Sequence, residues 1–167
     1  ISEGATDVEV WFDFYCPHCQ EFEAANGSTI TEMVEKDEIA LSMVPVALQG
    51  LNAASGTAFS ERSANAAYCV AVDNPDAVYP FITDVFALFP SGQGLTDEEL
   101  TTMAADAGAD GAASCIADGT YNKFVLANAQ KLPPNPESGR AGTPTLLSDG
   151  EYVPVTNNPQ LDLIDRL

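Results

Sequence analysis

The first fifty residues carry the hydrophobic pattern of a strand, a helix and a second strand. Residues 8–15 are rich in valine and aromatic residues, which is typical of a buried strand. Pro17 suits the first turn of a helix, where its missing N–H is not needed, and the helix is expected to end near Glu35. The apolar positions that recur at helical spacing are Phe22, Ile30, Met33 and Val34. A second strand is expected over residues 39–48, so the chain opens as an α/β fold.

The pattern changes at about residue 50, and residues 50–132 look helical throughout. Apolar residues over 78–89 follow the i, i+3, i+4, i+7 spacing of an amphipathic helix. Thr96 and Glu99 match a capping box, which predicts a helix that ends near Gly108. The other expected helices are one marked by Ala64, Ala67, Tyr68 and Ala71, a short one after Asp110 that contains Cys115, and one over 120–132 with Phe124, Val125, Ala129 and Leu132 buried.

Strand patterns return after the proline-rich stretch 133–136, which ends the helical section. Two short apolar runs, 145–147 and 151–155, flank Ser148-Asp149-Gly150, which predicts an antiparallel hairpin. A last short helix is expected near Asn158. The predicted organisation is therefore an α/β domain made of residues 1–49 and 133–167, split by a helical insertion domain over 50–132.

The charge of the chain is strongly negative. Its 167 residues include 25 acidic and 6 basic side chains, for a net charge of −19. Such a field repels nucleic acid and anionic lipid, so neither is expected as a partner. The acids are spread along the chain, which favours a solvated acidic surface; a salt-rich habitat and attraction to basic unfolded clients remain alternatives.

No run of the sequence approaches the roughly 18 apolar residues that a membrane-spanning helix needs. The chain starts Ile1-Ser2-Glu3-Gly4, without Met and without the pattern of a signal peptide. A leader or a membrane anchor removed before this point is left open.

Four cysteines provide the candidate chemistry. Cys16 and Cys19 form a CxxC motif, whereas Cys69 and Cys115 stand far apart in the sequence. A zinc site would need all four thiols to converge from three segments, so no metal is expected. A bare CxxC could also be a structural bridge or half of a metal site, but a CxxC placed between a strand and a helix favours redox chemistry.

The position of the CxxC motif at the start of a helix predicts its reactivity. The helix dipole and the unpaired N–H groups of the first turn favour a thiolate, which should lower the pKa of Cys16. His18 can add a hydrogen bond or, when protonated, a positive charge. Both effects stabilise the reduced form, so the Cys16–Cys19 disulfide should be a good oxidant of other thiols. Cys19, one turn into the helix, should be the more buried thiol.

Two motifs resemble a known family. Phe12-Asp13-Phe14-Tyr15-Cys16-Pro17-His18-Cys19 resembles the active-site segment of the DsbA-type disulfide oxidoreductases, and Gly142-Thr143-Pro144-Thr145 resembles the cis-proline loop of the thioredoxin superfamily. The resemblance implies a thioredoxin-like fold with an inserted helical domain. It also implies that Cys16 is the exposed nucleophile, Cys19 the resolving thiol and His18 the residue that tunes the pair.

The same resemblance assigns substrate binding to the loop that contains Pro144. Pro144 would be cis, with Thr143 facing the disulfide and its backbone bonding an extended client in the manner of an added strand. An ordinary turn proline at the start of a strand is the alternative.

The function that the resemblance implies is the donation of disulfides to reduced or unfolded exported polypeptides through a mixed disulfide. The redox-active disulfide would be the only cofactor, a membrane protein would reoxidise it, and the protein would be a monomer. Its location would be periplasmic or secreted, with or without a membrane anchor. The alternatives are a disulfide reductase or isomerase, and a redox-inactive module that binds peptides.

Two points depart from the family or extend it. Family members often have a buried acid six residues before the first cysteine, where this chain has Val10; strand alternation would put Glu9 and Asp13 on the opposite face, so Asp13 is only a weak substitute. Cys69 and Cys115 fall in the helical insertion. A structural disulfide is expected there in preference to two buried thiols, and it would indicate an oxidising compartment.

Overall fold

The computed structural model of the protein describes residues 4–88 and 91–167. Phe89, the last position of the amphipathic pattern predicted over 78–89, lies outside the described residues. The chain forms two compact units. One comprises Ile1–Phe12, Pro17–Val44 and Leu132–Leu167, and the other comprises Asp13–Cys16 and Pro45–Lys131. The prediction from the sequence placed residues 13–16 in the α/β domain, whereas in the structure Asp13–Cys16 belong to the helical unit.

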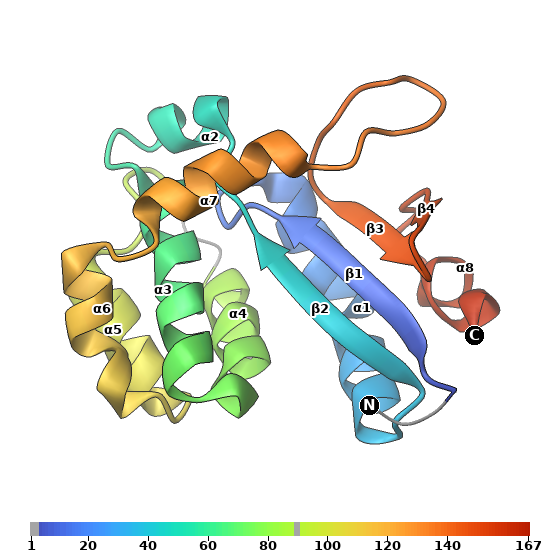
Figure 1. Cartoon of the computed structure of the whole chain (residues 1–167), viewed down its shortest axis with the longest axis horizontal. Coiled ribbons are helices and arrows are strands. Elements are labelled where there is room, and N and C mark those ends of the chain that lie inside the picture. The colour runs from blue at the N-terminus through green and yellow to red at the C-terminus, as the bar shows by residue number, and fades with distance from the viewer. Residues whose placement is uncertain (1–3, 89–90) are drawn as a thin grey trace. The chain divides into compact units, whose positions relative to one another are not determined.

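The first unit contains a four-stranded sheet with the order β2-β1-β3-β4. Its strands are β1 (Thr6–Phe12), β2 (Ile39–Pro45), β3 (Thr145–Ser148) and β4 (Glu151–Val153). β1 and β2 run in the same direction and are joined through a helix (Figure 1), as parallel neighbours require. β3 pairs antiparallel with β1, with Thr145 opposite Trp11. Both predicted leading strands are present, each a few residues shorter at its C-terminal end.

The predicted hairpin is confirmed. β3 and β4 pair antiparallel with Ser148 opposite Glu151, which leaves Asp149-Gly150 as a two-residue turn. Both turn residues have positive φ, 47° for Asp149 and 80° for Gly150, as a type I′ turn demands. Asp149 also exchanges two hydrogen bonds with the backbone of Asp7, at 2.8 and 2.9 Å, which fixes the hairpin to the start of β1.

Two helices complete the first unit. α1 (Pro17–Glu35) has the predicted bounds and buries Phe22, Ile30 and Met33, whereas Val34 is exposed. α8 (Pro159–Asp162) starts at Asn158, whose side chain accepts a hydrogen bond from the Gln160 N–H. α8 contacts α1, and the buried Asp162 accepts a hydrogen bond from Asn26 of α1. A short 3₁₀ turn, Ile164–Arg166, follows.

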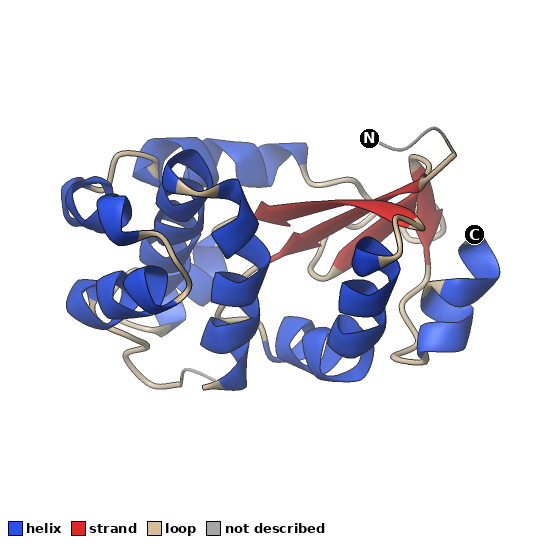
Figure 2. Cartoon of the chain, turned by 90° about the horizontal axis from the view of Figure 1, so that it is seen from below, coloured by secondary structure: helices blue, strands red, loops and turns tan. Residues whose placement is uncertain are grey.

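The second unit is helical, and the strands drawn red in Figure 2 belong to the other unit except for Pro45, the last residue of β2. Its helices are α2 (Gln49–Ala54), α3 (Phe59–Asp73), α4 (Val78–Ala87), α5 (Asp97–Asp106), α6 (Ala113–Asp118) and α7 (Asn122–Asn128). Three 3₁₀ turns, Pro75–Ala77, Asp110–Ala112 and Ala129–Lys131, connect or extend them. α3 contacts all five other helices. Its buried face consists largely of serine and alanine, which lets neighbouring helices approach closely.

In the helical unit, the capping motif was a more reliable guide than the apolar pattern of a short helix. The capping box of Thr96 and Glu99 is present in both directions at the start of α5. The predicted burial of Phe124 in α7 is wrong, because this side chain is 47% exposed. α7 is only two turns long and buries Val125 and Asn128, so fewer of its apolar side chains are buried than the spacing predicted.

The predicted structural disulfide is present. Cys69 of α3 and Cys115 of α6 are bonded, with their Cα atoms 5.7 Å apart and a sequence separation of 46. Closing a loop of this length stabilises the folded chain by on the order of 4 kcal/mol in the chain-entropy description. The bridge therefore ties the central helix to the later part of the same unit.

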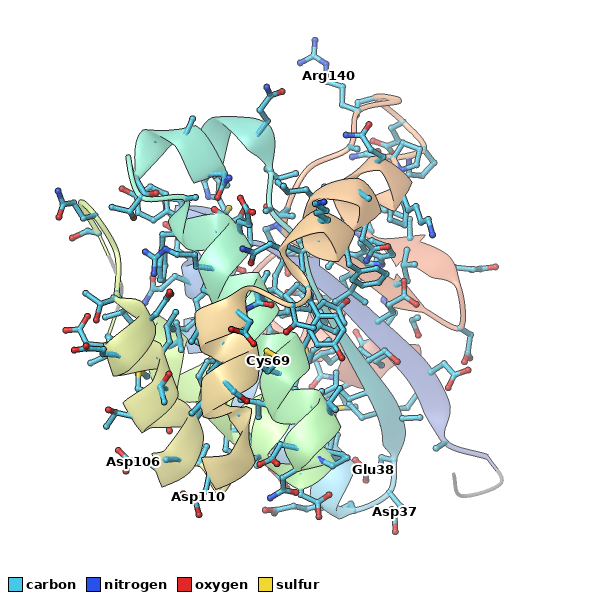
Figure 3. All side chains as sticks on the ribbon, turned by 60° about the vertical axis from the view of Figure 1, so that its left-hand side comes forward. Asp37, Glu38, Cys69, Asp106, Asp110 and Arg140 are labelled. Atoms are coloured by element: carbon cyan, nitrogen blue, oxygen red, sulfur yellow. A yellow bond between two sulfur atoms is a disulfide. The ribbon has the colours of Figure 1, made fainter. Side chains whose placement is uncertain are left out.

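In residues 4–88 and 91–167, no helix is long and apolar enough to cross a membrane. The same residues contain no cluster of His, Cys, Asp and Glu side chains suited to a metal ion. Acidic side chains such as Asp37, Glu38, Asp106 and Asp110 point outward from the ribbon (Figure 3).

Candidate active site

Cys16 directly precedes Pro17, the first residue of α1. It therefore occupies the position before the first turn, where backbone N–H groups lack helical partners and the dipole of this 19-residue helix is positive. Cys19 lies one turn into the helix. The structure thus gives the two thiols the different positions that the sequence analysis expected.

The burial of the two cysteines differs less than expected. Cys16 is 6% exposed and Cys19 is 1% exposed. Cys19 is the more buried of the two, as predicted, but the expectation of an exposed Cys16 is wrong, because Cys16 is buried as well.

Residues Asp13–Cys16 form a tight turn between β1 and α1. The Cys16 N–H donates to the Asp13 carbonyl oxygen at 3.1 Å, which closes the turn. The Tyr15 N–H donates to Asp13 Oδ1 at 2.8 Å, a side-chain turn that aspartate often makes. The backbone of Cys16 is therefore fixed by the residue three positions before it.

Asp13 is fully buried, which the sequence analysis missed. Its carboxyl group accepts hydrogen bonds from Ser60 Oγ of α3 at 2.7 Å and from the Leu48 N–H at 2.9 Å. Burial raises the pKa of Asp13 to about 6; the hydrogen bonds from Ser60, Leu48 and Tyr15 act in the opposite direction, and the charge of Cys16 adds to the rise. The strand-alternation argument failed because β1 ends at Phe12, so Asp13 belongs to the turn.

The two aromatic residues of the turn pack against the helical unit. The Phe14 ring lies 5.3 Å from that of Phe86 and 6.3 Å from that of Phe81, measured between centroids. The Tyr15 ring meets Phe59 edge-on at 6.1 Å, and its hydroxyl donates to the Gly92 carbonyl oxygen at 2.7 Å. Together with Asp13, these contacts explain why the turn belongs to the helical unit.

The loop that contains Gly92 is held in place by further contacts. Arg62 of α3 donates to the Leu95 carbonyl oxygen at 2.9 Å and forms an ion pair with Asp97 at 3.0 Å. Gly94 has a φ of +71°, and any Cβ there would collide with the Phe59 ring. The loop after α4 is therefore held close to the ring that supports Tyr15.

The position of the family's buried acid holds a buried valine, Val10, opposite Leu146 of β3. Glu9 accepts a hydrogen bond from the Trp11 indole N–H and does not replace that acid. Glu23 of α1 is buried four residues after Cys19, on the same helical face. The sequence analysis did not single out Glu23, although a carboxylate within an apolar stripe is a signal that could have identified it.

His18 lies on the exposed side of the start of α1. Its side chain is 77% exposed, and Nδ1 lies 3.2 Å from a carboxylate oxygen of Glu21. A protonated imidazole would therefore form a solvent-exposed ion pair with that carboxylate. The tuning role of His18 stays a prediction.

The Thr143–Pro144 peptide bond is cis, as predicted. Pro144 lies immediately before β3, and Thr145 pairs with Trp11 near the end of β1 that leads into the turn. The Thr145 hydroxyl donates to the Gly142 carbonyl oxygen at 2.6 Å, which holds the loop in shape. Arg140 extends outward from the preceding loop (Figure 3). Client binding by Thr143 and Pro144 stays a prediction.

Comparisons with known proteins agree with this geometry. A family model described as thioredoxin matches residues 2–166. The chain is similar to reduced DsbA from Mycobacterium tuberculosis, at 29% identity and a TM-score of 0.79 over 90% of this chain and 76% of that one. It is similar to the disulfide bond oxidoreductase DsbG from the same organism, at 27% identity and a TM-score of 0.77 over 90% and 72% of the two chains.

A more distant neighbour is MdbA, a thiol-disulfide oxidoreductase from Corynebacterium matruchotii. It is 23% identical with a TM-score of 0.75, over 94% of this chain and 82% of that one, and supports the fold alone. Among curated proteins, none matches the sequence. The matches confirm the predicted thioredoxin-like fold with a helical insertion and the predicted enzyme class.

Proposed function

Because the chain belongs to the thioredoxin family, we propose that it is a thiol–disulfide oxidoreductase that donates its Cys16–Cys19 disulfide to reduced polypeptides outside the cytoplasm. The observation that carries the proposal is the placement of Cys16 directly before α1, on a turn whose backbone and side chains are fixed. A sulfur held in this way is a good leaving group, because the helix N-terminus stabilises its thiolate.

The proposed reaction proceeds by two thiolate attacks. A client thiolate attacks Sγ of Cys16, a client–Cys16 bond forms, and the Cys16–Cys19 bond breaks with Cys19 leaving as a thiolate that takes up a proton. A second client thiolate then attacks the client sulfur of this mixed disulfide, and Cys16 leaves as a thiolate. The client loses two electrons and the CxxC pair gains them.

The client would lie along the loop that contains the cis-proline. Thr143 precedes Pro144 there, and an extended peptide can add to such a backbone as a strand does, with little demand on its side chains. Binding through the client's backbone depends little on the client's amino-acid sequence, which suits an enzyme that acts on many unfolded clients. Reoxidation of Cys16 and Cys19 by a membrane protein would complete the cycle.

The Cys69–Cys115 bridge supports an extracytoplasmic location. Structural disulfides persist in oxidising compartments and are rare where glutathione keeps thiols reduced. The same compartment supplies clients that need disulfides.

Oxidation of a reduced, unfolded substrate tests the proposal. Catalytic amounts of the oxidised protein are expected to restore the substrate's activity in a glutathione buffer, and Cys16→Ala should reduce the rate to background. In Cys19→Ala, oxidised glutathione from the buffer forms a mixed disulfide with Cys16 and releases one glutathione thiol. Attack of a client thiolate on the Cys16 sulfur then releases the second glutathione, and the covalent Cys16–client complex should accumulate, visible on a non-reducing gel and lost on reduction. Equal rates for the wild type and Cys16→Ala would favour a redox-inactive binding module.

A reductase is the second candidate, and the buried Asp13 favours it. A carboxylate near Cys16 disfavours the thiolate and therefore makes the disulfide a weaker oxidant. The equilibrium with glutathione decides between the two: a donor is largely reduced at equilibrium in a mildly oxidising buffer, whereas a reductase remains largely oxidised.

A further inference from the structure

We propose that Asp13 is a positioning residue for the redox pair, which holds Cys16 at the start of α1 and whose negative charge opposes ionisation of the Cys16 thiol. The inference deepens the proposed function and rests on it. One buried carboxylate would thus both hold Cys16 in position and contribute the negative charge near its sulfur.

The geometric argument rests on the origin of the four hydrogen bonds that Asp13 accepts. Its carboxylate receives the Tyr15 N–H of the turn, the Leu48 N–H that follows β2 and the Ser60 hydroxyl of α3, at 2.8, 2.9 and 2.7 Å. Its carbonyl oxygen receives the Cys16 N–H at 3.1 Å. One residue thus joins two other segments, the one after β2 and α3, to the turn that carries Cys16.

The charge of Asp13 is not neutralised by a cation. Within residues 4–88 and 91–167, no Lys, Arg or His forms an ion pair with it, so N–H and O–H dipoles alone balance the carboxylate. The titratable groups nearest to it in the turn are Cys16 and Tyr15, and the Tyr15 hydroxyl is engaged with Gly92. Cys16, three residues after Asp13 in the same turn, is therefore one group on which this charge acts.

The interaction between the two groups is reciprocal. The repulsion between a charged Cys16 and a charged Asp13 raises the pKa of Asp13, and at any pH where Asp13 is ionised it costs the Cys16 thiolate the same free energy. The helix N-terminus acts in the opposite direction. Asp13 therefore limits how strongly α1 stabilises the Cys16 thiolate, and with it the oxidising power of the disulfide.

Reduction of the disulfide should also change the protonation of Asp13. Two electrons convert the disulfide into a Cys16 thiolate and a Cys19 thiol, which consumes one proton. The new negative charge at Cys16 makes Asp13 bind a further proton more readily. Near the pKa of Asp13, reduction is then accompanied by more than one proton.

A titration of the wild-type protein tests this directly. The ¹³C chemical shift of the Asp13 carboxyl group is followed against pH in the oxidised and the reduced protein. The midpoint is expected to be higher in the reduced protein, where the thiolate is present. Identical midpoints would overturn the electrostatic part of the proposal, whatever any variant does.

Variants then separate charge from geometry. Asp13→Asn should shift the equilibrium with glutathione severalfold toward the reduced protein at a pH well above 6, where Asp13 of the wild type is ionised and opposes the Cys16 thiolate. Ser60→Ala is the matched control, because it removes one hydrogen bond to Asp13 and keeps the carboxyl group. Equal shifts in both variants would attribute the effect to lost packing and overturn the proposal.

These measurements do not depend on client turnover. If the wild-type protein fails to oxidise a client, the proposed function fails while the two titrations still report on Asp13. If the wild type oxidises the client but Asp13→Asn leaves the glutathione equilibrium unchanged, the function stands and the role of Asp13 fails.

Discussion

At the scale of single residues, the buried carboxyl group of Asp13 makes stability depend on pH. Its pKa in the folded protein is about 6, against 3.8 for the ordinary group, chiefly because burial disfavours the charge. Between these values the folded protein holds a proton that the unfolded chain has released. This contribution to stability is therefore full below about pH 4 and is lost as the pH rises to about 6.

We expect Asp13→Asn to remove this dependence. The free energy of unfolding of the wild type, relative to that of the variant, should fall by roughly 3 kcal/mol at most between pH 4 and pH 7, because one pKa unit corresponds to about 1.4 kcal/mol. Urea denaturation at each pH measures it. Asp106→Asn, the same change at an exposed site, serves as the control. Parallel profiles for the wild type and both variants would contradict the expectation.

The sequence was sufficient to place the CxxC motif at the start of a helix and to predict the cis-proline, but it did not predict the groups that support the turn before Cys16. Cys16, Cys19 and Pro144 lie in motifs that are contiguous in the chain, so local pattern was sufficient. The environment of Asp13 depends on Leu48 and Ser60, which are 35 and 47 residues away. Nothing near Asp13 in the sequence indicates that a backbone N–H and a serine hydroxyl will meet it.

At the scale of elements, the predictions succeeded where a cap, a turn or a long period marked the chain. α1 has the expected bounds, Asp149-Gly150 forms the expected turn, and Thr96 begins α5 as expected. They failed at short elements such as α7, where two turns of helix are too few for a period to define the buried face. There the neighbours decide, and Phe124 packs edge-on against Tyr68 instead of entering the core.

The Cys69–Cys115 bridge is the element-scale feature with the largest expected effect. Replacing both cysteines with serine should lower the free energy of unfolding by about 2–4 kcal/mol, mainly because the unfolded chain loses a constraint on a long loop. Chemical denaturation in a Cys16→Ala, Cys19→Ala background measures this without interference from the redox pair. In that background, a reductant should destabilise the protein that retains the bridge and leave the serine variant unchanged. Equal stability with and without the bridge would contradict the prediction.

At the scale of the whole molecule, the net charge of −19 sets the response to salt. Few cations are available to pair with the acids, and in the described residues Lys36 and Arg62 are the Lys and Arg side chains that form ion pairs. Mutual repulsion among the remaining carboxylates opposes the compact state and is screened when the Debye length falls from about 10 Å at 0.1 M salt to about 3 Å at 1 M.

We therefore expect sodium chloride to stabilise the protein at neutral pH. The melting temperature at pH 7 should rise by several degrees between about 0.1 and 1 M salt. At pH 4, close to the sequence pI of about 4.1, the same series should have little effect, because the net charge is near zero. A salt response of the same size at both pH values would indicate a general effect of the salt on hydration and not screening of the acidic surface.

Helix α3 carries Ser60 in its first turn and Cys69 further along. The helix that supports the turn before Cys16 is thus itself secured by an oxidised cysteine pair. A newly made molecule must acquire the Cys69–Cys115 bond before α3 is fully secured, so on the proposed function its maturation depends on the very reaction it performs. Older molecules, or another oxidant, would have to prepare each new one.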